Sequence, residues 1–227
     1  MGTRDDNVNA RANQSADRAK NYSPSVQYAI VQVLPNLTNG SFWGFTDVKD
    51  IQKHISAIQT EPNLTARKLG NACLLEVSPK FILSAVQAID PNALTNEDLN
   101  NIQKKMAEAT VEFEKFLISR GKKGFSGMIG IYCTNNVTAI KYKGTNYPAF
   151  RLPMSQALEI MNMYGYQIQV GQSFMSAQQA SGAGQALWDS TQLSPTKTGI
   201  LINIKSTYSP EQMAQCEKQF KMKYNIK

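Results

Sequence analysis

Apolar residues are spaced with a helical period before Gly121 and with a strand period after it. Between Thr95 and Gly121 they recur every three or four positions, at Leu99, Ile102, Met106, Ala109, Phe113 and Phe116. This spacing places one apolar stripe along a helix of about seven turns. Thr95 with Asp98 forms a variant of the capping box, and Gly121 is a typical helix end. We predict a core-facing helix over 95–121, with a packing surface for a partner helix as the alternative.

Four shorter helices are predicted ahead of this one. Cap residues and prolines bound them at residues 23–34, 46–59, 65–77 and 78–89. Residues 1–22 are polar and hold few apolar side chains, so we expect this tail to be disordered or loosely helical on its own. The sequence therefore predicts a polar tail over 1–22 and an all-helical domain over 23–121.

Two runs of alternating apolar residues, 127–134 and 137–144, flank the dipeptide Asn135-Asn136. This dipeptide tolerates the positive φ angles of a tight turn, so the two runs predict a β-hairpin. In the register that this turn implies, Ile131 faces Ile140. The opposite face of the hairpin then carries Tyr132, Lys141 and Lys143.

The remaining pattern completes an α+β domain over 122–227. Strands are predicted at 166–170 and 199–207, and helices at 153–165 and from Ser209, which opens a capping box. Between them, 172–193 predicts a short helix around 174–180 and a loop. We expect a four-stranded, largely antiparallel sheet that helices cover.

Charge divides the chain at the same place as the periodicity. Residues 1–121 hold 13 Lys/Arg and 13 Asp/Glu, whereas residues 122–227 hold 11 and 4, which together give the 24 and 17 of the whole chain. The formal excess of +7 therefore lies entirely in the second part. This coincidence supports a domain boundary at about Gly121.

Few residues offer enzymatic or metal chemistry. His54 is the single histidine, and it lies on the apolar side of its predicted helix, where a packed histidine is favoured over a catalytic one. The cysteines Cys73, Cys133 and Cys216 are far apart and lack Cys-x-x-Cys spacing. That pattern favours buried thiols in a reducing compartment over a disulfide framework or a zinc site. We expect no cofactor and no metal.

The glycine-rich stretch Gly182-Ala183-Gly184 is a weak signal for phosphate binding. It lacks the lysine of a P-loop, and Leu187 stands where the dinucleotide fingerprint has its third glycine. A flexible connection is the favoured interpretation. An enzyme would need a site that only the folded chain assembles.

Targeting and membrane signals are weak. No stretch approaches the roughly 18 consecutive apolar residues that a membrane span needs. The first twenty residues have no apolar core of a signal peptide. We expect a cytoplasmic protein without a membrane span.

Lysines form the clearest candidate binding surface. They stand beside an aromatic residue on the predicted hairpin, and they recur at the domain junction and in the last helix. A nucleic-acid surface needs cations that neutralise phosphates and rings that stack on bases, while an edge strand uses the same lysines for solubility. The candidate surface consists of Tyr132, Lys141, Lys143, Lys122, Lys123, Lys218, Lys221 and Lys223.

Docking onto an acidic partner protein uses the same physics, with charge steering the encounter and aromatic residues anchoring it. Phe42, Trp43 and Phe45 are candidate anchors in a turn-rich stretch. Arginine, which phosphate-binding surfaces favour, is scarce after Gly121, since Arg151 stands alone there. We therefore favour a non-enzymatic adaptor or accessory subunit of a larger assembly, such as a secretion or recruitment complex. Other protein subunits are the expected partners, and nucleic acid is the alternative ligand.

Overall fold

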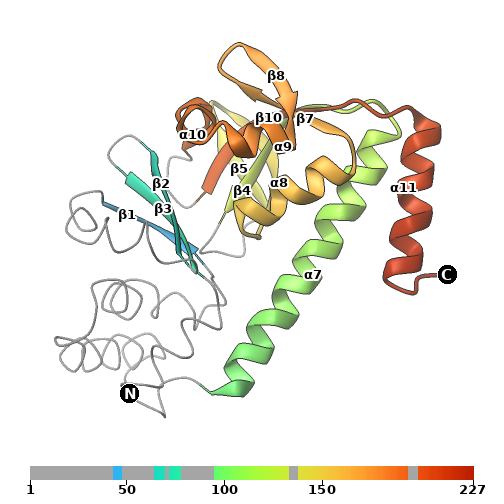
Figure 1. Cartoon of the computed structure of the whole chain (residues 1–227), viewed down its shortest axis with the longest axis horizontal. Helices are drawn as coiled ribbons and strands as arrows, with labels where there is room; N and C mark the ends of the chain where they lie inside the picture. Colours follow the sequence, from blue (N-terminus) through green and yellow to red (C-terminus); the bar gives the residue numbers. More distant parts are fainter. Residues whose placement is uncertain (1–42, 48–63, 70–71, 78–94, 133–137, 194–198) are drawn as a thin grey trace. The chain divides into compact units, whose positions relative to one another are not determined.

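The computed structural model describes residues 43–47, 64–69, 72–77, 95–132, 138–193 and 199–227. They belong to two compact units, of which the first comprises 1–105 with 133–135 and the second 106–132 with 136–227. Helix α7 (Asn96–Gly121) confirms the predicted long helix and its end at Gly121 (Figure 1). Its second half belongs to the second unit. The predicted domain limits at residues 22 and 121 stay predictions.

Besides the first residues of α7, the described part of the first unit is a small antiparallel sheet. Strands β1 (Trp43–Asp47), β2 (Leu64–Leu69) and β3 (Ala72–Val77) are ordered β1-β3-β2. The predicted helix over 65–77 is wrong, because β2 and β3 pair antiparallel from Leu64 with Val77 to Leu69 with Ala72. The dipeptide Gly70-Asn71, between the two strands, is a hairpin signal in the sequence, and the helix prediction did not weigh it.

The predicted all-helical domain is therefore not confirmed. The helices predicted at 23–34 and 78–89 lie outside the described residues. So does the helix predicted at 46–59, apart from Thr46 and Asp47, which are the last residues of β1.

The second unit confirms the α+β class but has more strands than predicted. Its sheet has seven strands ordered β5-β6-β4-β10-β7-β8, with β9 also paired to β10, instead of four. The sheet is mixed, because β4 and β6 are parallel whereas the other pairs are antiparallel. The strands are β4 (Ser126–Tyr132), β5 (Ala139–Tyr142), β6 (Thr145–Phe150), β7 (Tyr166–Val170), β8 (Ser173–Ser176), β9 (Gln192–Leu193) and β10 (Gly199–Ser206).

The predicted pairing of 127–134 with 137–144 is wrong. Strand β5 pairs with β6, from Ala139 with Pro148 to Tyr142 with Thr145. The tight turn lies at Lys143-Gly144, where φ is +47° and +82°. Two successive positive φ values are those of a type I′ turn, and glycine adopts them without strain. Strand β4 instead pairs with β10 and β6.

The core of the second unit lies between one face of the sheet and the helices. Isoleucines of the central strands are buried on that face, namely Ile129, Ile131, Ile200, Ile202, Ile204 and Ile168. Helix α7 covers them, since the Phe113 ring lies 4.9 Å from that of Phe150 in β6. The Tyr166 hydroxyl donates a hydrogen bond of 2.6 Å to the Leu117 carbonyl. Burial alternates along β7, whereas Leu201 of β10 is also buried, on the opposite face, in a second cluster with Ile140 and Ala149.

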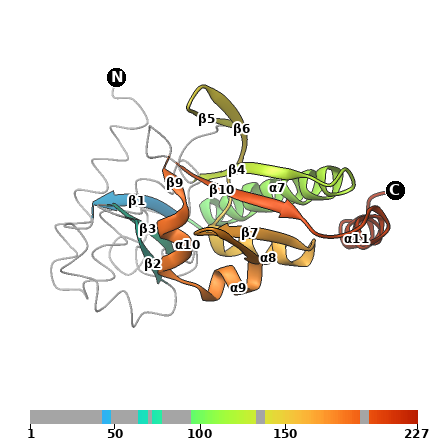
Figure 2. The same ribbon diagram turned by 90° about the horizontal axis from the view of Figure 1, so that it is seen from above.

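The remaining helices follow their local signals. Helix α8 (Met154–Met163) begins after Pro153 and buries five side chains, as predicted. The segment expected to be a short helix and a loop contains β8, α9 (Ala177–Gly182) and α10 (Gln185–Ser190). The chain ends with α11 (Pro210–Lys223), whose N-cap Ser209 forms the predicted capping box with Gln212. Figure 2 shows α8 and α9 on the side of the sheet opposite the projecting β5–β6 hairpin.

Candidate functional site

The structure divides the predicted lysine surface into two separate places. Lys122 and Lys123 follow the end of α7, and α11, which carries Lys218, Lys221 and Lys223, lies beside that end. Lys141 and Lys143 lie on the β5–β6 hairpin, which projects elsewhere in the second unit (Figures 1 and 2). Tyr132, the last residue of β4, pairs through its backbone with Gly199, and its side chain is outside the described atoms. The eight residues do not form one continuous surface.

Of the two hairpin lysines, Lys141 lies in β5 and Lys143 lies in the turn that follows it. Lys143 adopts a positive φ, and its ammonium group lies 5.3 Å from the centre of the Tyr142 ring. The Tyr142 hydroxyl donates a hydrogen bond of 3.0 Å to Gln192. Lys141 is exposed. This part of the predicted surface is a small patch with a partly buried aromatic ring.

The end of α7 presents lysines beside apolar residues. Ile118 is 4% exposed, while Lys115 and Lys123 are exposed on either side of it in sequence. The helix ends in a tight turn, because the Lys123 N–H donates to the Arg120 carbonyl and the Gly124 N–H to that of Gly121. A Cβ built on Gly121 would lie 2.3 Å from the Met213 methyl group, which shows how closely α11 approaches.

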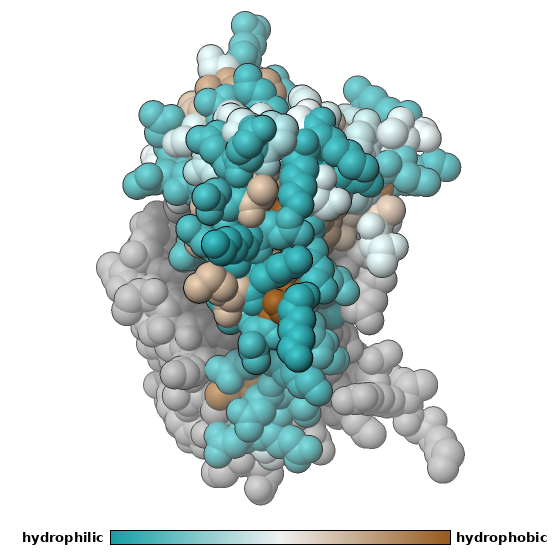
Figure 3. Space-filling view, turned by 90° about the vertical axis from the view of Figure 1, so that its right-hand side faces the viewer, coloured by the Kyte–Doolittle hydropathy of each residue, from teal (hydrophilic) through white to brown (hydrophobic). Residues whose placement is uncertain are grey.

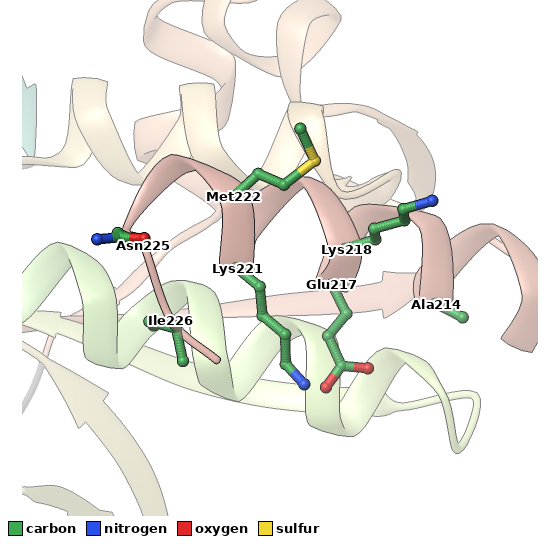
Figure 4. Close-up of a pocket in the computed structure, with 7 residues that line it drawn as sticks. All are labelled: Ala214, Glu217, Lys218, Lys221, Met222, Asn225 and Ile226. Atoms are coloured by element: carbon green, nitrogen blue, oxygen red, sulfur yellow. The ribbon is translucent and has the colours of Figure 1, made fainter.

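Helix α11 is amphipathic, and its apolar side faces the second unit. Met213, Cys216 and Phe220 are buried at spacings of three and four residues. Figure 4 shows Glu217 and Lys221 extending from α11 toward α7, while Lys218 and Met222 extend to the other side. The described face over α11 is mostly hydrophilic with small hydrophobic islands, as Figure 3 shows.

A buried carboxylate joins α7, α8 and α11. Glu114 has no exposed surface, and its oxygens accept hydrogen bonds from the hydroxyls of Tyr164 and of Tyr224, the latter at 2.7 Å. The Lys223 ammonium group lies 3.5 Å from the same carboxylate. A buried charge needs such partners, because desolvation alone would disfavour it. Glu114 therefore ties the end of α11 to the core and leaves no carboxylate surface for a ligand.

The pKa shifts in this cluster follow from its burial. Burial, then the hydrogen bond to Glu114, raises the pKa of Tyr164 far above its usual value. Burial would lower the pKa of Lys223, but the charge of Glu114 and the neighbouring Tyr224 raise it overall. The cluster therefore favours neutral tyrosines and a charged lysine.

An ion pair connects the two helices at the surface. The Lys122 ammonium group donates to the Glu217 carboxylate, and both side chains are about one-third exposed, at 38% and 33%. The hydrogen bond from Lys122 lowers the pKa of Glu217. This pair lies beside the hollow that α7 and α11 form.

We call that hollow the lysine groove. Its volume is about 330 Å³, and an adjoining hollow of about 460 Å³ on α11 shares Glu217, Lys221 and Ile226 with it. Cations surround an apolar floor of Ile118 and Phe220, with Ile226 at the edge. The groove is lined by Lys115, Ile118, Ser119, Lys122, Lys123, Glu217, Phe220, Lys221 and Ile226.

The lining is suited to binding an anion together with an apolar group. Its ionisable residues are four lysines and one glutamate. Cys216 lies on the buried side of α11, and burial raises the pKa of its thiol. Among the residues that the structure describes, no group of three or more His, Cys, Asp or Glu is placed to hold a metal ion.

None of the described helices combines the length and the apolar composition that a membrane span requires.

The predicted aromatic anchors belong to the first unit. Trp43 and Phe45 lie in β1, where their backbones pair with Glu76 and Leu74. Phe42 is outside the described residues. Their role as anchors stays a prediction.

Sequence reasoning found three of the nine lining residues and missed six, namely Lys115, Ile118, Ser119, Glu217, Phe220 and Ile226. Lys115 had a usable signal. Lys115 precedes Lys122 by seven residues, and Ile118 lies between them, so a helix that continues to Gly121 places all three on one face. Ile226 follows α11 and had no such signal, because the chain turns back there: its N–H donates to the Lys221 carbonyl.

Comparison with known proteins adds no identification. No family model, curated protein or solved structure matches this chain.

Proposed function

We propose that this chain is a non-enzymatic interaction subunit, an adaptor or accessory component of a larger protein assembly, and that its second unit docks onto a partner protein. The observation that supports this proposal is the lysine groove, in which cations surround an apolar floor between α7 and α11. Protein interfaces combine an apolar centre with a polar rim, and charge on the rim steers association.

The groove is less suited to nucleic acid. Single-stranded nucleic acid binds where bases stack on exposed rings within a basic channel. Among the described residues that line the groove, the only ring belongs to Phe220, which is 5% exposed. The cations of the groove are lysines, without the arginines that bind phosphates in bidentate fashion. A protein partner therefore accounts for the exposed Ile226 at the groove edge, which nucleic acid would not use.

The test is to isolate the tagged full-length chain from its native cells at moderate salt, with and without nuclease. We expect a complex much larger than the 25.2 kDa monomer that survives nuclease and contains other proteins in stoichiometric amounts. Lys115→Gln with Lys221→Gln should release those proteins, because these lysines lie on the groove rim.

The matched control removes the same charge from the hairpin. Lys141→Gln with Lys143→Asn should retain the complex, since asparagine tolerates the positive φ of position 143. Collapse to the monomer with loss of absorbance at 260 nm after nuclease would show that the ligand is nucleic acid.

A further inference from the structure

We propose that the lysine groove receives an acidic segment of the partner that inserts an apolar side chain between α7 and α11. This inference rests on the proposed function and specifies the partner's chemistry. It is carried by three properties of the groove: its charge, its apolar floor and its concave form.

The positive charge of the groove is only partly compensated. Lys122 pairs with Glu217, the single acidic residue among the described residues of the lining. Within the described part of the chain, no carboxylate lies within ion-pair distance of Lys115, Lys123 or Lys221. Lys218 adds a further cation on the adjoining hollow. A segment rich in Asp and Glu supplies the missing countercharge and excludes basic partners.

Apolar atoms lie within this ring of charge. Ile118 and Phe220 form the floor, and Ile226 is 37% exposed at its edge. Met222, next to Lys221, is 74% exposed and lines the adjoining hollow. Ile118 and Phe220 are only 4% and 5% exposed, so the apolar surface open to a ligand belongs mainly to Ile226 and Met222, and a purely hydrophilic polyanion would leave that surface without a partner. An aliphatic or aromatic side chain in the acidic segment would cover it and gain the free energy of burial.

The form of the site favours an inserted segment over a flat surface. The groove lies between two helices, and its volume of about 330 Å³ can accept a large side chain. Ligand sites in proteins range from roughly 300 to 1,000 Å³. An anionic membrane would instead contact the outward side of α11 around Met222, and would leave the groove empty.

The experiment measures binding of a short fluorescent peptide to the purified full-length chain by anisotropy. The probe consists of glutamates with two phenylalanines, and a matched probe replaces both phenylalanines by serine. We expect the phenylalanine probe to bind at least about fivefold more tightly, which corresponds to roughly 1 kcal/mol of apolar burial. Equal binding of the two probes would overturn the proposed apolar insertion.

Variants of the groove locate the site. Lys115→Gln with Lys221→Gln should weaken binding of the phenylalanine probe by about fivefold or more, whereas Lys141→Gln with Lys143→Asn should leave it unchanged. Ile226→Ser should abolish most of the advantage of the phenylalanine probe over the serine probe. Equal weakening by the two lysine pairs would show a diffuse attraction to positive charge and overturn the groove assignment.

Vesicles provide the competing outcome. We expect no co-sedimentation with vesicles that contain about one-third anionic lipid. Co-sedimentation that Met222→Ser abolishes, together with absent peptide binding, would assign the basic end of the second unit to membranes. If the peptide fails to bind but the nuclease-resistant protein complex persists, this inference is wrong while the proposed function stands.

Discussion

Gly165 holds the connection between α8 and β7 in a conformation that other residues adopt with strain. Its φ is +68°, and a Cβ built on it would lie 2.2 Å from two atoms of the Tyr208 ring. Its carbonyl accepts a hydrogen bond of 3.0 Å from the Thr207 N–H, just ahead of α11. One residue therefore combines a backbone requirement with close packing against the segment that leads into the last helix.

Replacing this glycine should destabilise the second unit more than the positive φ alone explains. We expect Gly165→Ala to lower the free energy of unfolding by about 2 kcal/mol or more, because it adds the Tyr208 contact to the strain of a positive φ. Gly171 is the matched control, since its φ is +62° but nothing lies within 4 Å of its Cβ position. Gly171→Ala should cost about 1 kcal/mol. Urea denaturation of both variants checks the difference, and equal losses would show that Tyr208 moves aside freely.

At the scale of the element, α11 depends on its N-terminal cap. The Ser209 hydroxyl accepts a hydrogen bond from the Gln212 N–H at 3.2 Å, and Gln212 accepts one from the Ser209 N–H at 2.9 Å. These bonds satisfy two backbone donors that a helix N-terminus otherwise leaves to solvent. The cap thereby helps to define the helix that forms one wall of the lysine groove.

Removing the cap should loosen the start of α11. We expect Ser209→Ala to cost about 1 kcal/mol of stability and to speed amide hydrogen exchange in the first turn of α11. Ser119→Ala, at an exposed position inside α7, is the control and should change stability by less than about 0.5 kcal/mol. Unchanged exchange in α11 after Ser209→Ala would contradict a stabilising role of the cap.

Elements with local signals were predictable, while those fixed by distant pairing were not. Gly121, Pro153 and the capping box at Ser209 act within a few residues, and α7, α8 and α11 begin or end there. The partner of β4 depends on β10, about 70 residues later, which no local pattern encodes. Asn135-Asn136 and Lys143-Gly144 are both possible turn dipeptides in the sequence. The turn of the β5–β6 hairpin lies at Lys143-Gly144.

The candidate site was predictable only in part. Lys122, Lys123 and Lys221 were identified from the charge division and line the groove together. The buried state of Glu114 was not predictable, because an acidic residue in a helix is usually exposed and its two tyrosine partners lie 50 and 110 residues away. Three-dimensional packing alone brings such groups together.

At the scale of the whole molecule, the raised pKa values of several tyrosines make the stability of the fold depend on pH in the alkaline range. Burial raises the pKa of Tyr166, whose side chain is 1% exposed, and burial with the Glu114 hydrogen bond raises that of Tyr164. For a tyrosine whose pKa is raised in the folded state, the stabilisation is complete below the unfolded value of about 10 and is lost as pH rises above it. The raised pKa of Lys223 acts in the same direction.

The contribution of these groups to stability should therefore change little between about pH 7 and 9 and fall steeply above about pH 10. Each tyrosine that stays protonated only in the folded state contributes a slope of about 1.4 kcal/mol per pH unit. Tyr164→Phe should lower stability at neutral pH by about 1 kcal/mol, through the lost hydrogen bond to Glu114, and make the alkaline slope shallower. Denaturant titrations across this pH range measure both effects, and an unchanged slope would contradict the contribution of Tyr164.

The position of β10 also determines when the protein can fold during its synthesis. This strand lies between β4 and β7, yet it ends at Ser206, near the carboxyl end of the sequence printed here. A ribosome adds residues from the amino end, so the β4–β6 and β7–β8 parts emerge well before the strand that joins them. Until then the isoleucines of β4 and β7 lack their β10 neighbours and are open to chaperones and proteases. A nascent chain that stops before residue 199 carries β4, β6, β7 and β8 but lacks β10, so it cannot close the sheet.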